Sequence, residues 1–97
     1  MNVPGTVEGK VVSVTEQGNL VTDISPEQLN GAPRDEGVVV VCDEHETQGL
    51  FELGHDQPES TFIALIGESG CLELEIVGLS ASIMLGIRVG EAVTVRW

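Results

Sequence analysis

Glycines separate short runs of branched aliphatic residues along this 97-residue chain, and this pattern constrains the fold more than any other feature. Twelve glycines and four prolines interrupt apolar runs such as Val38–Val41. Branched side chains are stiff and pack well on a pleated surface, whereas glycine suits tight turns. The pattern therefore predicts an all-β, mainly antiparallel fold.

Seven strands are expected, at residues 7–15, 20–24, 37–43, 47–53, 61–66, 71–77 and 92–97. Residues 37–43 are the most continuously apolar and are expected to be central, with a charged turn following at residues 44–46. Residues 71–77 alternate apolar and acidic side chains, which is typical of a strand with one wet face. A small β-barrel or coiled sheet would protect the edges of these strands.

Two short helical turns are expected between the strands. Ser25 is an N-cap candidate, with Pro26 at the first helical position. Ser80 is placed to cap a second turn that Gly86 would end. Ninety-seven residues provide one core, so residues 1–97 are interpreted as a single domain.

The charge balance is strongly acidic, with 16 acidic and 4 basic residues and a net charge of −12. Phosphate backbones and anionic membranes would be repelled, so neither nucleic acid nor a membrane is an expected partner. A solvated acidic surface is the simplest explanation, and a cationic ligand or basic partner is the functional alternative. The sequence has no signal peptide and no apolar run of roughly 18–20 residues, so a cytoplasmic location is expected by default.

The residue types that often carry chemistry do not fall into a recognised motif. Cys42 and Cys71 are expected to be free and buried, although the sequence leaves a disulfide open. The stretch 42–46 and His55-Asp56 lack zinc-ligand spacing, so no metal site is expected. Ser69 or Cys71 paired with a histidine lacks the context of a nucleophile elbow, so no catalytic residue is assigned.

Three segments together resemble a known family. They are Gly9-Lys10-Val11-Val12-Ser13-Val14 with Gly18-Asn19-Leu20-Val21-Thr22-Asp23-Ile24, then Ile66-Gly67-Glu68-Ser69-Gly70 with Leu72-Glu73-Leu74, and finally Leu85-Gly86-Ile87 with Val89-Gly90-Glu91. Their order and spacing are similar to the C-terminal domain of the S-adenosylmethionine hydroxide adenosyltransferases and the related fluorinase and chlorinase. No single segment is specific, and the resemblance depends on their collinearity.

The resemblance implies a binding role for a few residues. Asn19 occupies the place of the family's adenine-binding Asn, a side chain that offers a purine edge both a donor and an acceptor. Phe51 is the candidate for an aromatic residue that stacks on adenine. The turn residues that would line the pocket are Gly18, Gly67, Glu68 and Ser69. S-adenosylmethionine or adenosine is the implied ligand, and no bound cofactor is implied.

The chain also departs from the family at the amino-acid end of the ligand. Thr15 stands where the family has Asp, Gln17 where it has Phe, and Val77 where it has Asn. Glu68 falls near the position of the residue pair that binds the methionine carboxylate in the family, where its negative charge would repel that carboxylate. The family's N-terminal domain, which supplies the water-activating residues, is not represented. The expected protein is a catalytically incomplete binding module.

The resemblance also implies a homo-oligomer, a trimer by analogy. Its interface would use either Leu74 and Ile76 or the group Ile83, Met84 and Leu85. One alternative is an enzyme subunit that hydrolyses S-adenosylmethionine to adenosine and methionine together with a separately encoded N-terminal domain. Another alternative is a structural barrel or one that senses a small ligand. An oxyanion is an unfavourable ligand for such a barrel, because the net charge of −12 would repel it.

Overall fold

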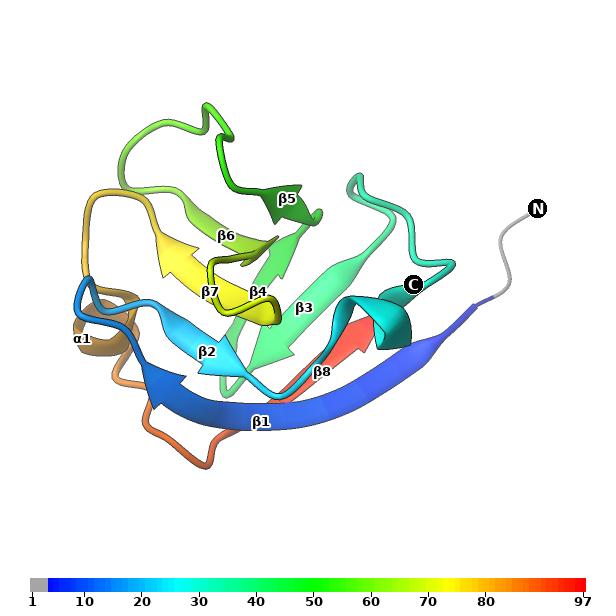
Figure 1. Cartoon of the computed structure of the whole chain (residues 1–97), viewed down its shortest axis with the longest axis horizontal. Helices are drawn as coiled ribbons and strands as arrows, with labels where there is room; N and C mark the ends of the chain where they lie inside the picture. Colours follow the sequence, from blue (N-terminus) through cyan, green and yellow to red (C-terminus); the bar gives the residue numbers. More distant parts are fainter. Residues whose placement is uncertain (1–3) are drawn as a thin grey trace.

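Eight short strands form one sheet in the computed structural model, which describes residues 4–97 (Figure 1). The sheet order is β4-β3-β8-β1-β2-β7-β6-β5. The strands are β1 (Thr6–Val14), β2 (Leu20–Thr22), β3 (Val39–Cys42), β4 (His45–Gln48), β5 (Phe51–Glu52), β6 (Phe62–Ile66), β7 (Leu72–Ile76) and β8 (Ala92–Arg96). The expected all-β fold is confirmed.

The sheet curls into a half-barrel, and the side chain of Thr47 helps to join its two ends. All neighbouring strands pair antiparallel except β5 and β6, which run parallel. On β4, Thr47 Oγ1 donates a hydrogen bond to the carbonyl oxygen of Phe62 on β6, at 2.7 Å. The strands β4 and β6 are far apart in the sheet order, and the curl of the sheet brings them close enough for this bond (Figure 1). The expectation of a coiled, mainly antiparallel sheet is confirmed.

The strand count differs from the expected seven because the run 47–53 is broken in the middle. Gly49 N donates to Val38 O and Leu50 N donates to Arg34 O, both at 3.0 Å, which diverts the chain between β4 and β5. The charged turn is also shorter than expected: His45 already pairs with Cys42 in the β3–β4 hairpin. The strand β3 has neighbours on both sides but lies second from the sheet edge rather than at its centre.

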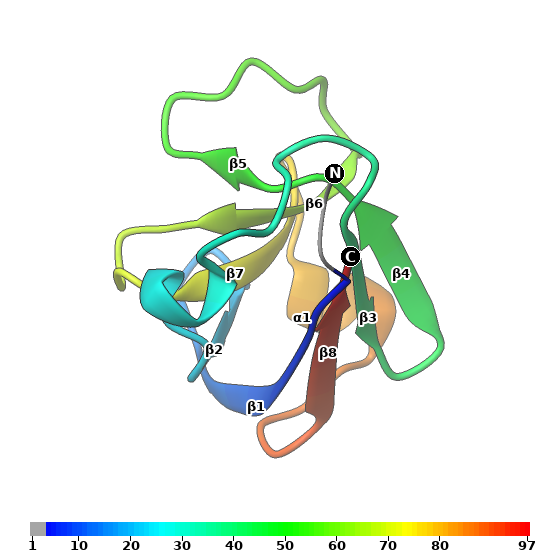
Figure 2. The ribbon, with the colours of Figure 1, turned by 90° about the vertical axis from the view of Figure 1, so that its right-hand side faces the viewer.

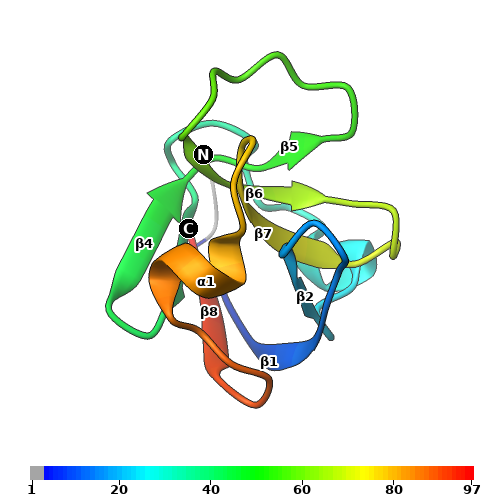
Figure 3. The ribbon, with the colours of Figure 1, turned by 90° about the vertical axis from the view of Figure 1, so that its left-hand side faces the viewer.

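Both helical turns begin at the expected caps. Ser25 and Gln28 form a capping box at the start of the 3₁₀ turn η1 (Pro26–Leu29). Ser80 caps the helix α1 (Ala81–Leu85), and Gly86 ends it in the left-handed region. The turn η1 lies at the end of the half-barrel that faces the viewer in Figure 2, whereas α1 lies at the opposite end, in front in Figure 3.

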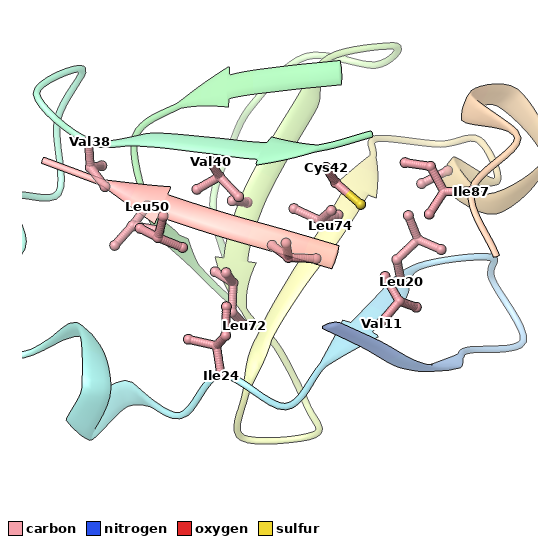
Figure 4. Close-up of a cluster of buried hydrophobic side chains, with 14 of the residues drawn as sticks. Val11, Leu20, Ile24, Val38, Val40, Cys42, Leu50, Leu72, Leu74 and Ile87 are labelled. Atoms are coloured by element: carbon pink, nitrogen blue, oxygen red, sulfur yellow. The ribbon is translucent and has the colours of Figure 1, made fainter. Parts of the chain in front are cut away.

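The main core fills the inside of the curled sheet (Figure 4). It is built almost entirely from aliphatic side chains: Val11, Leu20, Ile24, Leu29, Val38, Val40, Cys42, Leu50, Ala64, Leu72, Leu74, Ile76, Ala81, Ile87, Val93 and Val95. Leu74 and Ile76 belong to this core, so the expectation that they form a subunit interface is wrong. They point inward because alternate residues of a strand face opposite sides.

Candidate functional site

A second buried layer covers the outer face of β2, β7 and β6. In the register of these strands, Glu73 lies opposite Val21 on one side and Leu65 on the other. These side chains face away from the main core, yet all three are buried. The segment after β5 lies across them, because Leu53, Gly54 and His55 line the same hollow as Leu65 and Glu73. A cleft is thus formed between a sheet face and a loop.

This cleft encloses about 260 Å³. Its lining residues are Thr15, Gln17, Asn19, Leu53, Gly54, His55, Leu65, Glu68, Ser69, Glu73 and Glu75. A second hollow beside it shares Gln17, Asn19 and Glu75 and continues to Leu79 and Ser80. Three of the residues expected to bind a ligand, Asn19, Glu68 and Ser69, therefore share one cleft.

Asn19 is held by its backbone at the end of the β1–β2 turn. Thr15 N donates to Asn19 O at 2.9 Å, and Asn19 N donates to Thr15 Oγ1 at 3.0 Å. The turn is closed by a further bond from Gly18 N to Thr15 O, at 2.9 Å. Within residues 4–97 the side-chain amide of Asn19 has no hydrogen-bond partner. Its donor and acceptor therefore remain available in the cleft.

The N-terminus of α1 supports this turn from behind. Ser82 N donates to Gly18 O at 2.9 Å, and a Cβ atom on Gly18 would overlap the Ser80 side chain. Gly18 also has a φ of 92°, which side-chain-bearing residues rarely adopt. Gly18 thus supports Asn19 through close packing and does not itself line the cleft.

The turn after β6 holds the buried carboxylate of Glu73, a residue of β7 that lines the cleft. Ser69 N donates to Glu73 Oε2 at 3.0 Å. Gly67 has no side chain where its Cβ would meet the Glu73 carboxylate, so the glycine makes room for that group. Glu73 is only 3% exposed, and Glu75 is half-buried. The expectation of a wet acidic face on β7 is therefore wrong, because the loop after β5 covers that face.

His55 joins the covering loop to the sheet. Its Nε2 lies 3.5 Å from Glu75 Oε1, and its Nδ1 accepts a hydrogen bond from Gln57 N at 3.2 Å. The Phe51 ring packs edge-on against the His55 ring, with centroids 6.2 Å apart. Phe51 therefore lies beside a cleft residue rather than in the cleft lining. Gly67 opens on a neighbouring hollow that is lined by Arg34 and Ile66 among others.

Sequence reasoning missed the carboxylates of Glu73 and Glu75 as site residues. Their alternation with leucine and isoleucine indicates only which side of β7 they occupy. The signal that could have found them is the glycine at position 67, which belongs to the turn that resembles the family's later turn. The sequence offers His55 only as a metal ligand or a base, and its place opposite Glu75 depends on a loop without a strong sequence pattern.

The cysteines do not take part in this cleft. Both are free thiols, with Cys42 in the main core and Cys71 half-buried. Burial raises the pKa of the Cys42 thiol to about 11, and the charges of Glu91 and Asp43 act in the same direction.

Among residues 4–97, no group of three or more His, Cys, Asp or Glu side chains is arranged to hold a metal ion. None of the helices in that part of the chain is long and apolar enough to cross a bilayer.

Two solved structures share this fold. An uncharacterized conserved protein from Thermotoga maritima superposes with a TM-score of 0.77 at 22% sequence identity, covering 92% of this chain and 34% of its own. A conserved hypothetical protein from Thermus thermophilus gives a TM-score of 0.69 at 26% identity, covering 91% of this chain and 34% of its own. This chain thus corresponds to about a third of each protein's length. No curated protein sequence matches it.

The family comparison is more specific than the fold comparison. Residues 9–94 match the model of the SAM hydroxide adenosyltransferase C-terminal domain. The match contains the β1–β2 turn with Asn19, the turn at residues 67–70 and the acidic strand β7. The chain therefore belongs to the family of the SAM hydroxide adenosyltransferase C-terminal domain.

Proposed function

We propose that this domain is a binding module for an adenosine-type nucleoside, which it holds in the cleft beside Asn19. The observation that carries the proposal is the side-chain amide of Asn19, which lines that cleft and has no hydrogen-bond partner among residues 4–97. Such an amide matches the paired donor and acceptor of a purine edge. The backbone of Asn19 is already fixed by Thr15, so binding costs little ordering of the turn.

The other lining residues suit a ligand with an apolar ring and several hydroxyl groups. Leu53 and Leu65 provide apolar surface within the cleft, while Gln17, Ser69 and the carboxylates provide polar atoms. Ligand sites commonly combine apolar lining with a few placed polar groups. Phe51 contributes by supporting His55, which lies across the cleft from the sheet.

The test is a thermal-shift and calorimetric titration with adenosine and S-adenosylmethionine. A ligand that binds only the folded state raises its stability by an amount that grows with ligand concentration. We expect adenosine to raise the Tm of the unmodified chain and to have no such effect on Asn19→Ala. Asn30→Ala is the matched control, because Asn30 is an exposed residue at the far end of η1. No shift at millimolar adenosine would contradict the proposal.

A second candidate is a subunit of an S-adenosylmethionine hydrolase, and family membership favours it. The chain covers only 34% of each solved structure. The rest of a complete enzyme would therefore come from sequence outside these 97 residues, such as a separately encoded N-terminal domain. We expect the 97-residue chain alone to release no adenosine from S-adenosylmethionine. If the unmodified chain releases adenosine and Asn19→Ala does not, the domain is catalytic and the binding proposal is replaced.

We also propose that the domain self-associates through the exposed side chains of α1. Ile83 is 81% exposed and Met84 is 60% exposed, and the exposed Leu79, just before the Ser80 cap of α1, lines the hollow that contains Asn19. Copies with a net charge of −12 repel one another, so association should strengthen as salt screens the charge. Sedimentation in low and high salt tests this, with Met84→Glu as the disrupting variant. A monomer under both conditions would contradict it.

A further inference from the structure

Within residues 4–97, the sheet ends at β4 in an edge with which no further strand pairs. β4 is the first strand of the sheet order and pairs with β3 on one side only. Figure 2 and Figure 3 view the molecule from opposite sides, and in both β4 lies at the outside of the half-barrel. The other end of the sheet is β5, which has only 2 residues. The longer free edge is therefore that of β4.

The register of the β3–β4 hairpin shows which backbone groups point out from this edge. Antiparallel strands alternate between hydrogen-bonded and non-hydrogen-bonded pairs. Gly49 N donates to Val38 O at 3.0 Å, so the pairs at every second step back along the hairpin are the hydrogen-bonded ones. Glu46 and Gln48 occupy the alternate positions, and their N–H and C=O groups point away from β3. No hydrogen bond to these groups is found among residues 4–97.

Two side chains hold β4 in place from the inner side of the sheet. Thr47 and His45 lie opposite buried residues of β3, so they face the inside of the half-barrel. Thr47 Oγ1 donates to Phe62 O at 2.7 Å, and His45 Nε2 lies 3.2 Å from Leu85 O at the end of α1. The edge is therefore preformed, and a strand that adds to it gains hydrogen bonds without having to order β4.

The surroundings of the edge differ between its two faces. On the outer face, Glu46 is exposed and lies close to the hairpin turn Asp43-Glu44, and residues 39–48 contain no Lys or Arg. On the inner face, Phe62 and Leu85 are apolar and only partly buried. A strand that lies along β4 would direct alternate side chains to these two faces.

We propose that the free edge of β4 is a docking site for an extended partner segment that alternates basic and apolar side chains and adds to the sheet as a further strand. Strand addition takes affinity from main-chain hydrogen bonds and specificity from alternate side chains. The basic side chains would meet Glu46 and the acidic turn, and the apolar ones would meet Phe62 and Leu85. A second copy of this chain is disfavoured, because two β4 edges would bring their acidic side chains together.

The test uses a short synthetic peptide that alternates lysine and valine and has both ends blocked. Titrated into the ¹⁵N-labelled chain, it should shift the amide signals of Glu46 and Gln48 and slow the hydrogen exchange of both amides. Binding should weaken as the salt concentration rises. A peptide of the same composition with its lysines and valines in two blocks should bind at least about tenfold more weakly, because only the alternating order places all lysines on one face of a strand.

Two edge variants and one matched control assign the contact. Gln48→Pro removes an outward N–H but none of the bonds to β3, and proline is tolerated on sheet edges, so we expect it to weaken peptide binding about tenfold. Glu46→Lys keeps the backbone and should weaken binding severalfold, which keeps the test valid if Gln48→Pro fails to fold. Glu27→Lys makes the same charge change on exposed η1 and should have much less effect.

The remaining results would overturn the proposal. No binding of the alternating peptide would refute the docking site, and equal binding of the block peptide would show attraction to an acidic surface without strand addition. Equal weakening by Glu27→Lys and Glu46→Lys would assign the effect to net charge rather than to the β4 edge. If the chain instead forms a dimer that Gln48→Pro abolishes, the edge pairs with a second copy and the basic partner is wrong.

Discussion

Thr15 and Asn19 hold each other through two hydrogen bonds, one between backbone groups at 2.9 Å and one from Asn19 N to Thr15 Oγ1 at 3.0 Å. The second bond uses the hydroxyl that stands where the resemblance implies an acidic residue. It leaves the Asn19 side chain unbonded while fixing the position of its Cα atom. Thr15 is therefore a positioning residue for the proposed site.

Replacing Thr15 by Val should weaken both the turn and the proposed site. The change removes the acceptor for Asn19 N at nearly constant volume, so we expect a loss of about 1 kcal/mol in the free energy of unfolding. Thr15→Ser keeps the hydroxyl and should restore adenosine binding. Urea unfolding and an adenosine titration on both variants provide the measurement. Equal binding by Thr15→Val and the unmodified chain would refute the positioning role.

The close approach of Gly67 to Glu73 predicts a coupled pair of mutations. A methyl group at position 67 would overlap the Glu73 carboxylate, so Gly67→Ala should destabilise the fold by about 1–3 kcal/mol. In the background of Glu73→Ala the same change should cost much less, because the carboxylate is gone. A double-mutant cycle by urea unfolding measures this coupling. Additive effects would mean that Gly67 is not needed to accommodate Glu73.

The raised pKa of Cys42 predicts how alkali affects stability. The folded state keeps this thiol protonated up to a pH of about 11, whereas a thiol in water has a pKa of about 9.0. Between these values the folded state binds more protons than the unfolded state, so this contribution to stability is complete below pH 9 and falls as the pH rises toward 11. Cys42→Ala should lose less stability than the unmodified chain between pH 9 and 11. Parallel curves would contradict the burial of a neutral thiol.

The same environment predicts the order of thiol reactivity. The thiolate is the reactive form, so a buried thiol with a raised pKa reacts slowly. Iodoacetamide at pH 8 should label Cys71 before Cys42 in the folded protein, and both should react alike in urea. Mass spectrometry of the labelled peptides gives the measurement. Faster labelling of Cys42 in the folded state would show that the β3 strand opens readily.

Core and surface leucine-sized residues should differ sharply in their contribution to stability. Leu74 is fully buried in the main core, so Leu74→Ala should cost about 2–5 kcal/mol through lost burial and a residual cavity. Met84 is exposed on α1, so Met84→Ala should change stability by no more than about 0.5 kcal/mol. Chemical unfolding of both variants provides the test. Similar costs would contradict the assigned faces of β7 and α1.

Sequence patterns predict most of this fold because its signals are local. Ser25 and Ser80 cap the two helical turns as expected, and the branched runs form strands. The break between β4 and β5 was not predictable, since it depends on hydrogen bonds from Gly49 and Leu50 to distant residues. Local alternation likewise places Glu73 and Leu74 on opposite faces of β7, but it does not reveal that a loop buries Glu73.

The candidate site was partly predictable for the same reason. Asn19, Glu68 and Ser69 lie on turns that the sequence marks clearly, and the structure brings them into one cleft. His55 comes from a loop whose path over the sheet follows from packing rather than from any repeated pattern. The family resemblance implies a stacking aromatic residue, for which Phe51 is the candidate, and its ring contacts His55 beside the cleft. Long-range packing thus decides which polar residues share the cleft.

The central claim, that the cleft beside Asn19 binds a nucleoside, is tested most directly by NMR. Adenosine is titrated into the ¹⁵N-labelled chain while backbone and side-chain amide signals are followed. The account predicts concentration-dependent shifts of the Asn19 side-chain amide and of the Ser69 backbone amide, while signals from the β3–β4 hairpin stay in place. Unchanged signals at millimolar adenosine, or shifts confined to that hairpin, would contradict it.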